Sequence, residues 1–470
     1  MGRYKKLFSN TAILALGTFA SKFLVFFMLP LYTGCLLPEE YSTADLITQT
    51  ANLLMPLACA GISMGVFRFA IDEAEDKRSV FSSGLAVLFA VSAAFVLLSP
   101  LVGTFDALDG YVLLIAVYVL CANLHAVVAQ YIRAKGNTLL FSLGGIIGTA
   151  LTISFNLLFL LGLDMGVEGY VLSIILGDVI VTAILFLVAR LWRDVDFSSV
   201  HRAKISDMLK YSIPMIPTTI FWWVTSVSDR YLVIAMKGSE VNGLYAAAYK
   251  VPTLLTLLCT VFIDAWQFSA VDEQNEKERS KFFTNVFAGF QGIMFMAASG
   301  LTLVARPVTA ILLDELYFDS WQYIPVLSLA MAFSGLVTFM GSIYMVRKKS
   351  MHSFLTAAVG AGTNILLNIV LIPQYSAMGA AIATFVSYLV VMIVRSADAL
   401  KMISFKIGIW KLVFNTLALC AQCAVSVGAV KGCLVWSIVI FLAVVAVNGR
   451  DILKSVLGIF RKYRKNPKKI

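Results

Sequence analysis

Fourteen long apolar segments, separated by short polar stretches, constrain this chain more than any other feature of its sequence. Each has the length of a membrane-spanning helix, about 20 apolar residues, and is too long for a barrel strand of about 9–11 residues. The composition agrees, since 60% of the residues are hydrophobic and 14% are charged, against about 45–50% and about 25% in soluble domains. We therefore predict an all-α polytopic membrane protein with about 14 transmembrane helices, and exclude a water-soluble enzyme. The expected spans are 11–35, 43–69, 80–104, 110–132, 139–163, 168–190, 207–236, 242–270, 282–305, 323–346, 352–374, 377–400, 411–430 and 432–449.

Lysine and arginine are distributed unevenly between the two sides of these segments. The N-terminal tail, every second loop and the C-terminal tail hold 30 of the 37 Lys and Arg residues, whereas the opposite loops hold only three. Cytoplasmic loops of membrane proteins collect Lys and Arg, so we expect both termini in the cytoplasm. No basic face belongs to a soluble domain, so nucleic-acid binding is not expected. The basic tail at 450–470 is instead expected to lie against anionic lipid headgroups.

The two halves of the chain carry similar features at a nearly constant offset of 204–214 residues. The matched pairs are Lys22 and Arg230, Tyr41 and Tyr245, Arg133 and Arg347, and Asn156 and Asn368. Six spans lie in each repeat, and because six is even, both halves have the same orientation. This is the parallel repeat of many secondary transporters, in which the substrate binds between the halves. We predict one six-helix lobe over 1–206, a second over 207–406, two additional helices over 407–449 and a basic tail over 450–470.

Six segments of the chain are typical of one family, namely SKFLVFFMLPLYT, LPEEYSTADL, YIRAKGN, GLDMGVEGY, YSIPMIPTTIFWWVTSVSDRYLV and NGLYAAAYKVPTLL. By these segments the chain resembles, over nearly its whole length, polysaccharide and O-unit flippases of the multidrug/oligosaccharidyl-lipid/polysaccharide exporter superfamily. The resemblance implies a two-lobed fold like that of MATE transporters. It also implies flipping of a polyprenyl-pyrophosphate-linked oligosaccharide from the inner to the outer leaflet of the cell membrane by alternating access, coupled to an ion or to the membrane potential. The implied partners are that substrate, membrane lipids, and glycosyltransferases or a polymerase of the same pathway. The lipid II flippases are a sister group with fourteen spans, so a lipid II flippase is an alternative function.

Four of the 37 basic residues belong to neither set of loops and fall within the apolar segments. A Lys or Arg at the centre of a membrane helix costs about 2.5–3.5 kcal/mol on insertion scales, and such residues usually face a cavity or a partner. Lys22 lies near the middle of the first span, where no acid of the second span stands at equal depth, and the alternative to a free cation is a pair with a more distant acid such as Asp178 or Asp229. Arg230, Lys250 and Arg68 lie in later spans. We predict that these cations bind the substrate's pyrophosphate, with Arg68 at its inner end.

Some of these residues have alternative interpretations. Asp229 and Lys250 are equally distant from the polar turn between spans seven and eight, so an ion pair between them is as well supported as a role in ligand binding. Arg68 lies at the cytoplasmic end of its span, where a long side chain can reach the interface. Trp222 lies deep within span seven and could stack on a sugar or pack against lipid.

Asp178, Asp45 and Asp264 are the acids that we predict to bind a coupling Na⁺ or H⁺, with Asp178 as the first candidate. The sequence does not choose between these ions, and no other cofactor is expected because no Walker A motif is present.

No metal site is expected either. The three histidines, His125, His201 and His352, are scattered, and Cys420 and Cys423 lie in an apolar segment without a second cysteine pair. Structural zinc sites need four ligands at ordered spacing.

Three other functions compete with a lipid-linked oligosaccharide flippase. A multidrug exporter of the same superfamily would favour an acidic cavity for organic cations, whereas Lys22, Arg230 and Lys250 give this cavity a positive bias. A polysaccharide polymerase would be expected to have a long outer loop with catalytic residues, which this sequence lacks. A non-transporting scaffold of a polysaccharide assembly complex is compatible with the sequence.

Overall fold

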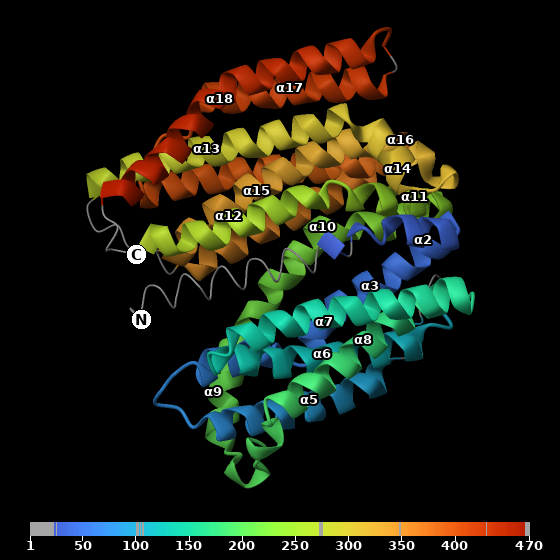
Figure 1. Cartoon of the computed structure of the whole chain (residues 1–470), viewed down its shortest axis with the longest axis vertical. Helices are drawn as coiled ribbons and strands as arrows, with labels where there is room; N and C mark the ends of the chain where they lie inside the picture. Colours follow the sequence, from blue (N-terminus) through green and yellow to red (C-terminus); the bar gives the residue numbers. More distant parts are fainter. Residues whose placement is uncertain are drawn as a thin grey trace. The chain divides into compact units, whose positions relative to one another are not determined.

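The computed structural model describes residues 23–24, 26–99, 103, 105, 108–271, 276–346, 349–428 and 430–465. Side chains are described at all of these except 264–271, 276–279, 281, 345–346, 350 and 450–465. Every regular element in these ranges is a helix (Figure 1), which confirms the predicted all-α class. Nine of the described helices are long and apolar enough to cross a membrane, or ten if one bent pair counts as a single span. The expected number of about 14 spans is therefore not confirmed.

The described residues form two compact units, which we call the N-terminal unit, up to Trp223, and the C-terminal unit, from Val224. The border lies inside one continuous helix, α10 (Ile216–Lys237), so this helix belongs to both units.

The described part of the N-terminal unit before α10 contains eight α-helices and four short π- or 3₁₀-helical turns. In chain order these are α2 (Leu29–Cys35), α3 (Pro38–Ala58), α4 (Ile62–Ala70), α5 (Lys77–Leu98), α6 (Val112–Ala134), α7 (Thr138–Asn156), the π-helical η3 (Leu157–Gly162), α8 (Gly166–Val188), η4 (Leu191–Arg193), η5 (Phe197–Ser199), α9 (Arg202–Ser212) and η6 (Ile213–Met215). The core of this unit lies between α4, α5, α6 and α8, where the rings of Phe81 and Tyr131 stack at 4.2 Å.

The expected span 43–69 is bent rather than straight, since α3 and α4 meet at 58°. Ala60 and Gly61 both have left-handed backbone angles, with φ of 50° and 63°. The Gly61 N–H donates to the Pro56 carbonyl and the Ala60 N–H to the Leu57 carbonyl, which is the hydrogen-bond pattern of a Schellman C-cap. The cap ends α3, and α4 begins directly after it.

The C-terminal unit contains the end of α10 and the remaining helices. These are α11 (Ser239–Lys250), α12 (Thr253–Val271), α13 (Glu276–Leu303), α14 (Ala305–Leu312), the 3₁₀ helix η7 (Glu315–Tyr323), α15 (Ile324–Val346), α16 (Ser350–Met402), α17 (Ile409–Val427) and α18 (Cys433–Lys465). The expected spans 352–374 and 377–400 together form α16, which breaks at Ser376, where φ is 54°.

The last two helices, α17 and α18, pack together along α13 (Figure 1). Buried polar side chains hold them there. Ser299 of α13 donates a hydrogen bond of 2.6 Å to the Gln422 side chain of α17. Asn415 and Asn448 exchange two amide hydrogen bonds of 3.0 and 2.8 Å between α17 and α18.

Candidate functional site

A buried carboxylate on α10 is the centre of a polar cluster in the C-terminal unit. The Asp229 side chain is 0% exposed. Its Oδ2 accepts a hydrogen bond of 2.5 Å from the Tyr245 hydroxyl of α11 and one of 3.2 Å from Thr384 Oγ1 of α16. Its Oδ1 accepts the Arg230 backbone N–H at 2.9 Å. The consecutive helices α10 and α11 and the distant helix α16 therefore meet at one carboxylate.

Further polar groups extend this cluster along the first half of α16. Asn364 Nδ2 donates to Thr384 Oγ1 at 3.4 Å, and Asn364 Oδ1 accepts from Ser228 at 3.0 Å and from Asn368 Nδ2 at 2.9 Å. Asn368 is fully buried, and its Oδ1 has no hydrogen-bond partner among the described residues. We call Ser228, Asp229, Tyr245, Asn364, Asn368 and Thr384 the Asp229 cluster.

The Asp229 cluster is rich in oxygen atoms of the kind that small hard cations prefer. It offers a carboxylate, hydroxyls and amide carbonyls, which are suitable ligands for Na⁺ and similar ions. A transition-metal site has no comparable support, because the described part of the chain contains no group of three or more His, Cys, Asp or Glu side chains that could hold a metal ion.

Arg230 follows Asp229 in sequence but points about 100° away around the helix. Its guanidinium lies 4.7 Å from the ring centroid of Tyr249, and only 3% of the residue is exposed. Tyr245 and Tyr249 are four residues apart, so α11 presents both from one face, one to the carboxylate and the other to the guanidinium. The sequence analysis missed Tyr249, Asn364 and Thr384 as site residues.

The other predicted cations have different surroundings. Lys22 lies outside the described residues. Arg68, in the last turn of α4, is exposed, whereas Lys250, in the last turn of α11, is half-buried. The ion pair considered between Asp229 and Lys250 is not among the described contacts of that carboxylate, which the hydroxyls and the backbone amide given above surround. Trp222 is half-buried in the part of α10 that belongs to the N-terminal unit.

The three predicted ion-coupling acids lie in separate places. Asp45 is buried in α3 and accepts a hydrogen bond of 3.4 Å from Gln49, whose carbonyl accepts one of 3.0 Å from the Trp223 indole. Asp178 is half-buried near the middle of α8. Asp264 falls in α12, but its side chain lies outside the described part of the structure.

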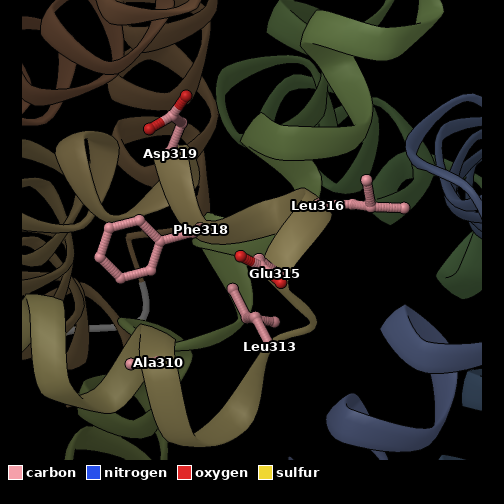
Figure 2. A pocket seen from close by; sticks show the side chains of 6 residues that line it. All are labelled: Ala310, Leu313, Glu315, Leu316, Phe318 and Asp319. Atoms are coloured by element: carbon pink, nitrogen blue, oxygen red, sulfur yellow. The ribbon is translucent and has the colours of Figure 1, made fainter.

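A pocket of about 570 Å³ lies beside α14 and η7 in the C-terminal unit (Figure 2). Its lining combines apolar side chains with two carboxylates, and consists of Ala310, Leu313, Glu315, Leu316, Phe318 and Asp319. Tyr323, at the end of η7, has its ring centroid 6.0 Å from that of Tyr245. The helix that lines the pocket therefore ends beside the Asp229 cluster.

Solved structures with a similar fold are membrane transporters. One is a lipid II flippase, MurJ, in an inward closed conformation, with 14% sequence identity and a TM-score of 0.71 over 94% of this chain and 100% of that one. Another is an inward-facing MATE family multidrug resistance transporter of the MOP superfamily, with 14% identity and a TM-score of 0.66 over 83% and 95%. A third is a mutant of the MATE transporter VcmN of Vibrio cholerae, with 13% identity and a TM-score of 0.58 over 84% and 96%.

A comparison of the sequence with curated proteins gives no match. Residues 7–268 match the family model for polysaccharide biosynthesis proteins, and this match covers more than half of the chain. The fold is shared with MurJ and the MATE transporters. The chain is therefore a member of the polysaccharide biosynthesis protein family.

Proposed function

We propose that this protein is a flippase that moves a polyprenyl-pyrophosphate-linked oligosaccharide from the inner to the outer leaflet of the cell membrane by alternating access. The observation that carries this proposal is the match of residues 7–268 to the polysaccharide biosynthesis family on a chain with the fold of a lipid II flippase. Glycosyltransferases would build the substrate on the cytoplasmic side, and a polymerase would use it on the other side.

The charged headgroup requires cations as it crosses the membrane, because a pyrophosphate binds best to Lys and Arg donors. Arg230 fits this role since it is buried on α10 and its guanidinium lies 4.7 Å from the centroid of the Tyr249 ring. Lys250 lies at the end of the helix that carries Tyr249. Lys22 and Arg68 are the corresponding candidates in the first half of the chain. Trp222 is the candidate for stacking on a sugar.

The Asp229 cluster is the best-supported site for a coupling Na⁺ or H⁺. Its carboxylate, hydroxyl and amide oxygens match the ligands of a hard cation, and Asn368 Oδ1 has no described partner. A Na⁺ or H⁺ bound at Asp229 would change the electrostatic potential at Arg230, the next residue. Ion binding and pyrophosphate binding would then be linked, and such linkage acts equally in both directions.

The fold alone also fits a multidrug exporter, so the test measures which class of substrate the protein transports. The full-length protein is reconstituted in vesicles that contain a fluorescent polyprenyl-pyrophosphate oligosaccharide, and an impermeant quencher reports which leaflet holds the label. We expect the protein to make the inner-leaflet label accessible, and to do so for this substrate better than for lipid II. Transport of an organic cation without flipping of the oligosaccharide lipid would instead identify an exporter.

A further inference from the structure

An acidic residue lies inside a membrane helix of the N-terminal unit, away from the Asp229 cluster. Asp178 stands near the middle of α8, a helix of 23 residues that is otherwise strongly apolar. Its side chain is half-buried. Among the described residues, its carboxylate takes part in no hydrogen bond and no ion pair. Ionisable residues at such positions are expensive and commonly belong to ion or proton pathways.

Two side chains of the neighbouring helix α6 lie within electrostatic reach of this carboxylate. They are the hydroxyl of Tyr118 and the thiol of Cys121. Neither carries a positive charge, so nothing in the described surroundings compensates an ionised Asp178.

A second protonatable group lies one helical turn further along α8. The Thr182 hydroxyl donates to the Asp178 backbone carbonyl at 2.5 Å, and His125 Nδ1 of α6 lies 3.0 Å from the same hydroxyl oxygen. Because the single hydroxyl proton is already donated, Nδ1 must be the donor to Thr182. Nε2 of His125 then carries the lone pair and is the atom that accepts a proton. Four helical residues separate the two sites by about 6 Å along the axis.

The other elements packed against α8 bring few ionisable groups to this region. α7 and η3 contain no charged residue and no His, Cys or Tyr. From α3, Tyr41 and Asp45 act on Tyr170, which is two turns away from Asp178 on α8. η4 contributes Arg193, which follows the end of the helix. Asp178 and His125 are therefore the acid and the base that α8 and α6 bring to adjacent helical turns, and Thr182 links His125 to the Asp178 backbone.

The chemistry of this pair fits a proton better than a metal ion. Na⁺ requires several oxygen ligands, whereas the side chains within electrostatic reach of Asp178 are one phenol and one thiol. A transition metal is also disfavoured, because these side chains form no metal-binding group in the described part of the chain. A proton needs one acceptor atom and no coordination sphere.

We propose that Asp178 and His125 form a proton-binding site between α6 and α8 of the N-terminal unit. The Asp178 carboxylate binds one proton, and His125 Nε2 is the second acceptor. This site is separate from the Asp229 cluster. The proposal concerns proton binding alone, so it stands or falls independently of oligosaccharide flipping.

The test is proton uptake and infrared spectroscopy on the full-length protein in nanodiscs. On acidification, we expect a C=O band of a protonated carboxyl group that Asp178→Asn removes. Asp178→Asn and His125→Gln should each take up one proton fewer than the wild type in a weakly buffered titration. Glu168→Gln is the matched control, because Glu168 is exposed on the same helix, and Asp229→Asn is the control for the other cluster. Both controls should keep the Asp178 band.

An unchanged carboxyl band and unchanged proton uptake in Asp178→Asn would overturn the proposal. If that variant does not fold, Asp178→Glu decides the matter, since it keeps a carboxyl group in a slightly different place. Its band must then shift relative to the wild type, and a band at the wild-type position would reject Asp178 as the proton carrier.

Discussion

Replacing Tyr245 with Phe removes one hydroxyl from the Asp229 cluster and leaves the aromatic ring in place. That hydroxyl lies 2.5 Å from Asp229 Oδ2, and both side chains are 0% exposed. A hydrogen bond to a charged group contributes about 1.5–3 kcal/mol, and one between neutral groups about 0.5–1.5 kcal/mol. Because the acceptor is a carboxylate, we expect Tyr245→Phe to lower the free energy of unfolding by about 1.5–3 kcal/mol.

The assay is unfolding of the detergent-solubilised protein in increasing dodecyl sulfate, followed by circular dichroism. Tyr323→Phe is the matched control, since its ring lies beside Tyr245 and its hydroxyl forms no hydrogen bond with the described residues. The control should change the free energy of unfolding by no more than about 0.5 kcal/mol.

Measuring Tyr245→Phe in the Asp229→Asn variant as well distinguishes the contribution of the hydrogen bond to the carboxylate from that of ring packing. In Asp229→Asn, the Tyr245 hydroxyl has a neutral acceptor, so the cost of Tyr245→Phe should fall by about 1 kcal/mol. Equal costs of Tyr245→Phe in both backgrounds would refute the view that this hydroxyl stabilises an ionised Asp229.

Two further predictions concern the added helices and the topology. Asn415→Leu leaves the buried Asn448 amide without its partner and should cost about 0.6–1.7 kcal/mol in the same unfolding assay, whereas adding Asn448→Leu should restore part of the loss. A larger loss in the double variant would contradict this. Single cysteines introduced at Asp109 and Lys204 should react with impermeant reagents from opposite sides of the membrane, and labelling from the same side would contradict the predicted topology.

The positions of many helices were predictable, because a helix that crosses the apolar core of a bilayer needs a long run of apolar residues. The expected segments 110–132 and 168–190 correspond closely to α6 (Val112–Ala134) and α8 (Gly166–Val188). The breaks were not predictable from hydropathy, since the bend after α3 depends on two residues with left-handed backbone angles. Apolar residues continue across it, so the sequence showed a single segment.

The Asp229 cluster was predictable only in part. Because Asp229 and Lys250 are equally distant from a turn, the sequence predicts that they lie at the same depth. It does not predict the rotation of each helix about its own axis, which decides whether the two side chains face each other. Thr384 lies 155 residues beyond Asp229, so its contact depends on how α16 packs against α10. The internal repeat was the one usable signal, because it singled out Tyr245 and Asn368, which both belong to the cluster.

The central claim, that membrane-embedded cations hold the pyrophosphate of a lipid-linked oligosaccharide, is tested most directly by the flipping rate of cation variants in vesicles. Lys22→Ala and Arg230→Ala should each lose flipping while their expression and membrane insertion match the wild type. Lys22→Arg should keep part of the activity, since it preserves the charge but changes the donor geometry. Wild-type flipping rates in both alanine variants would contradict the claim.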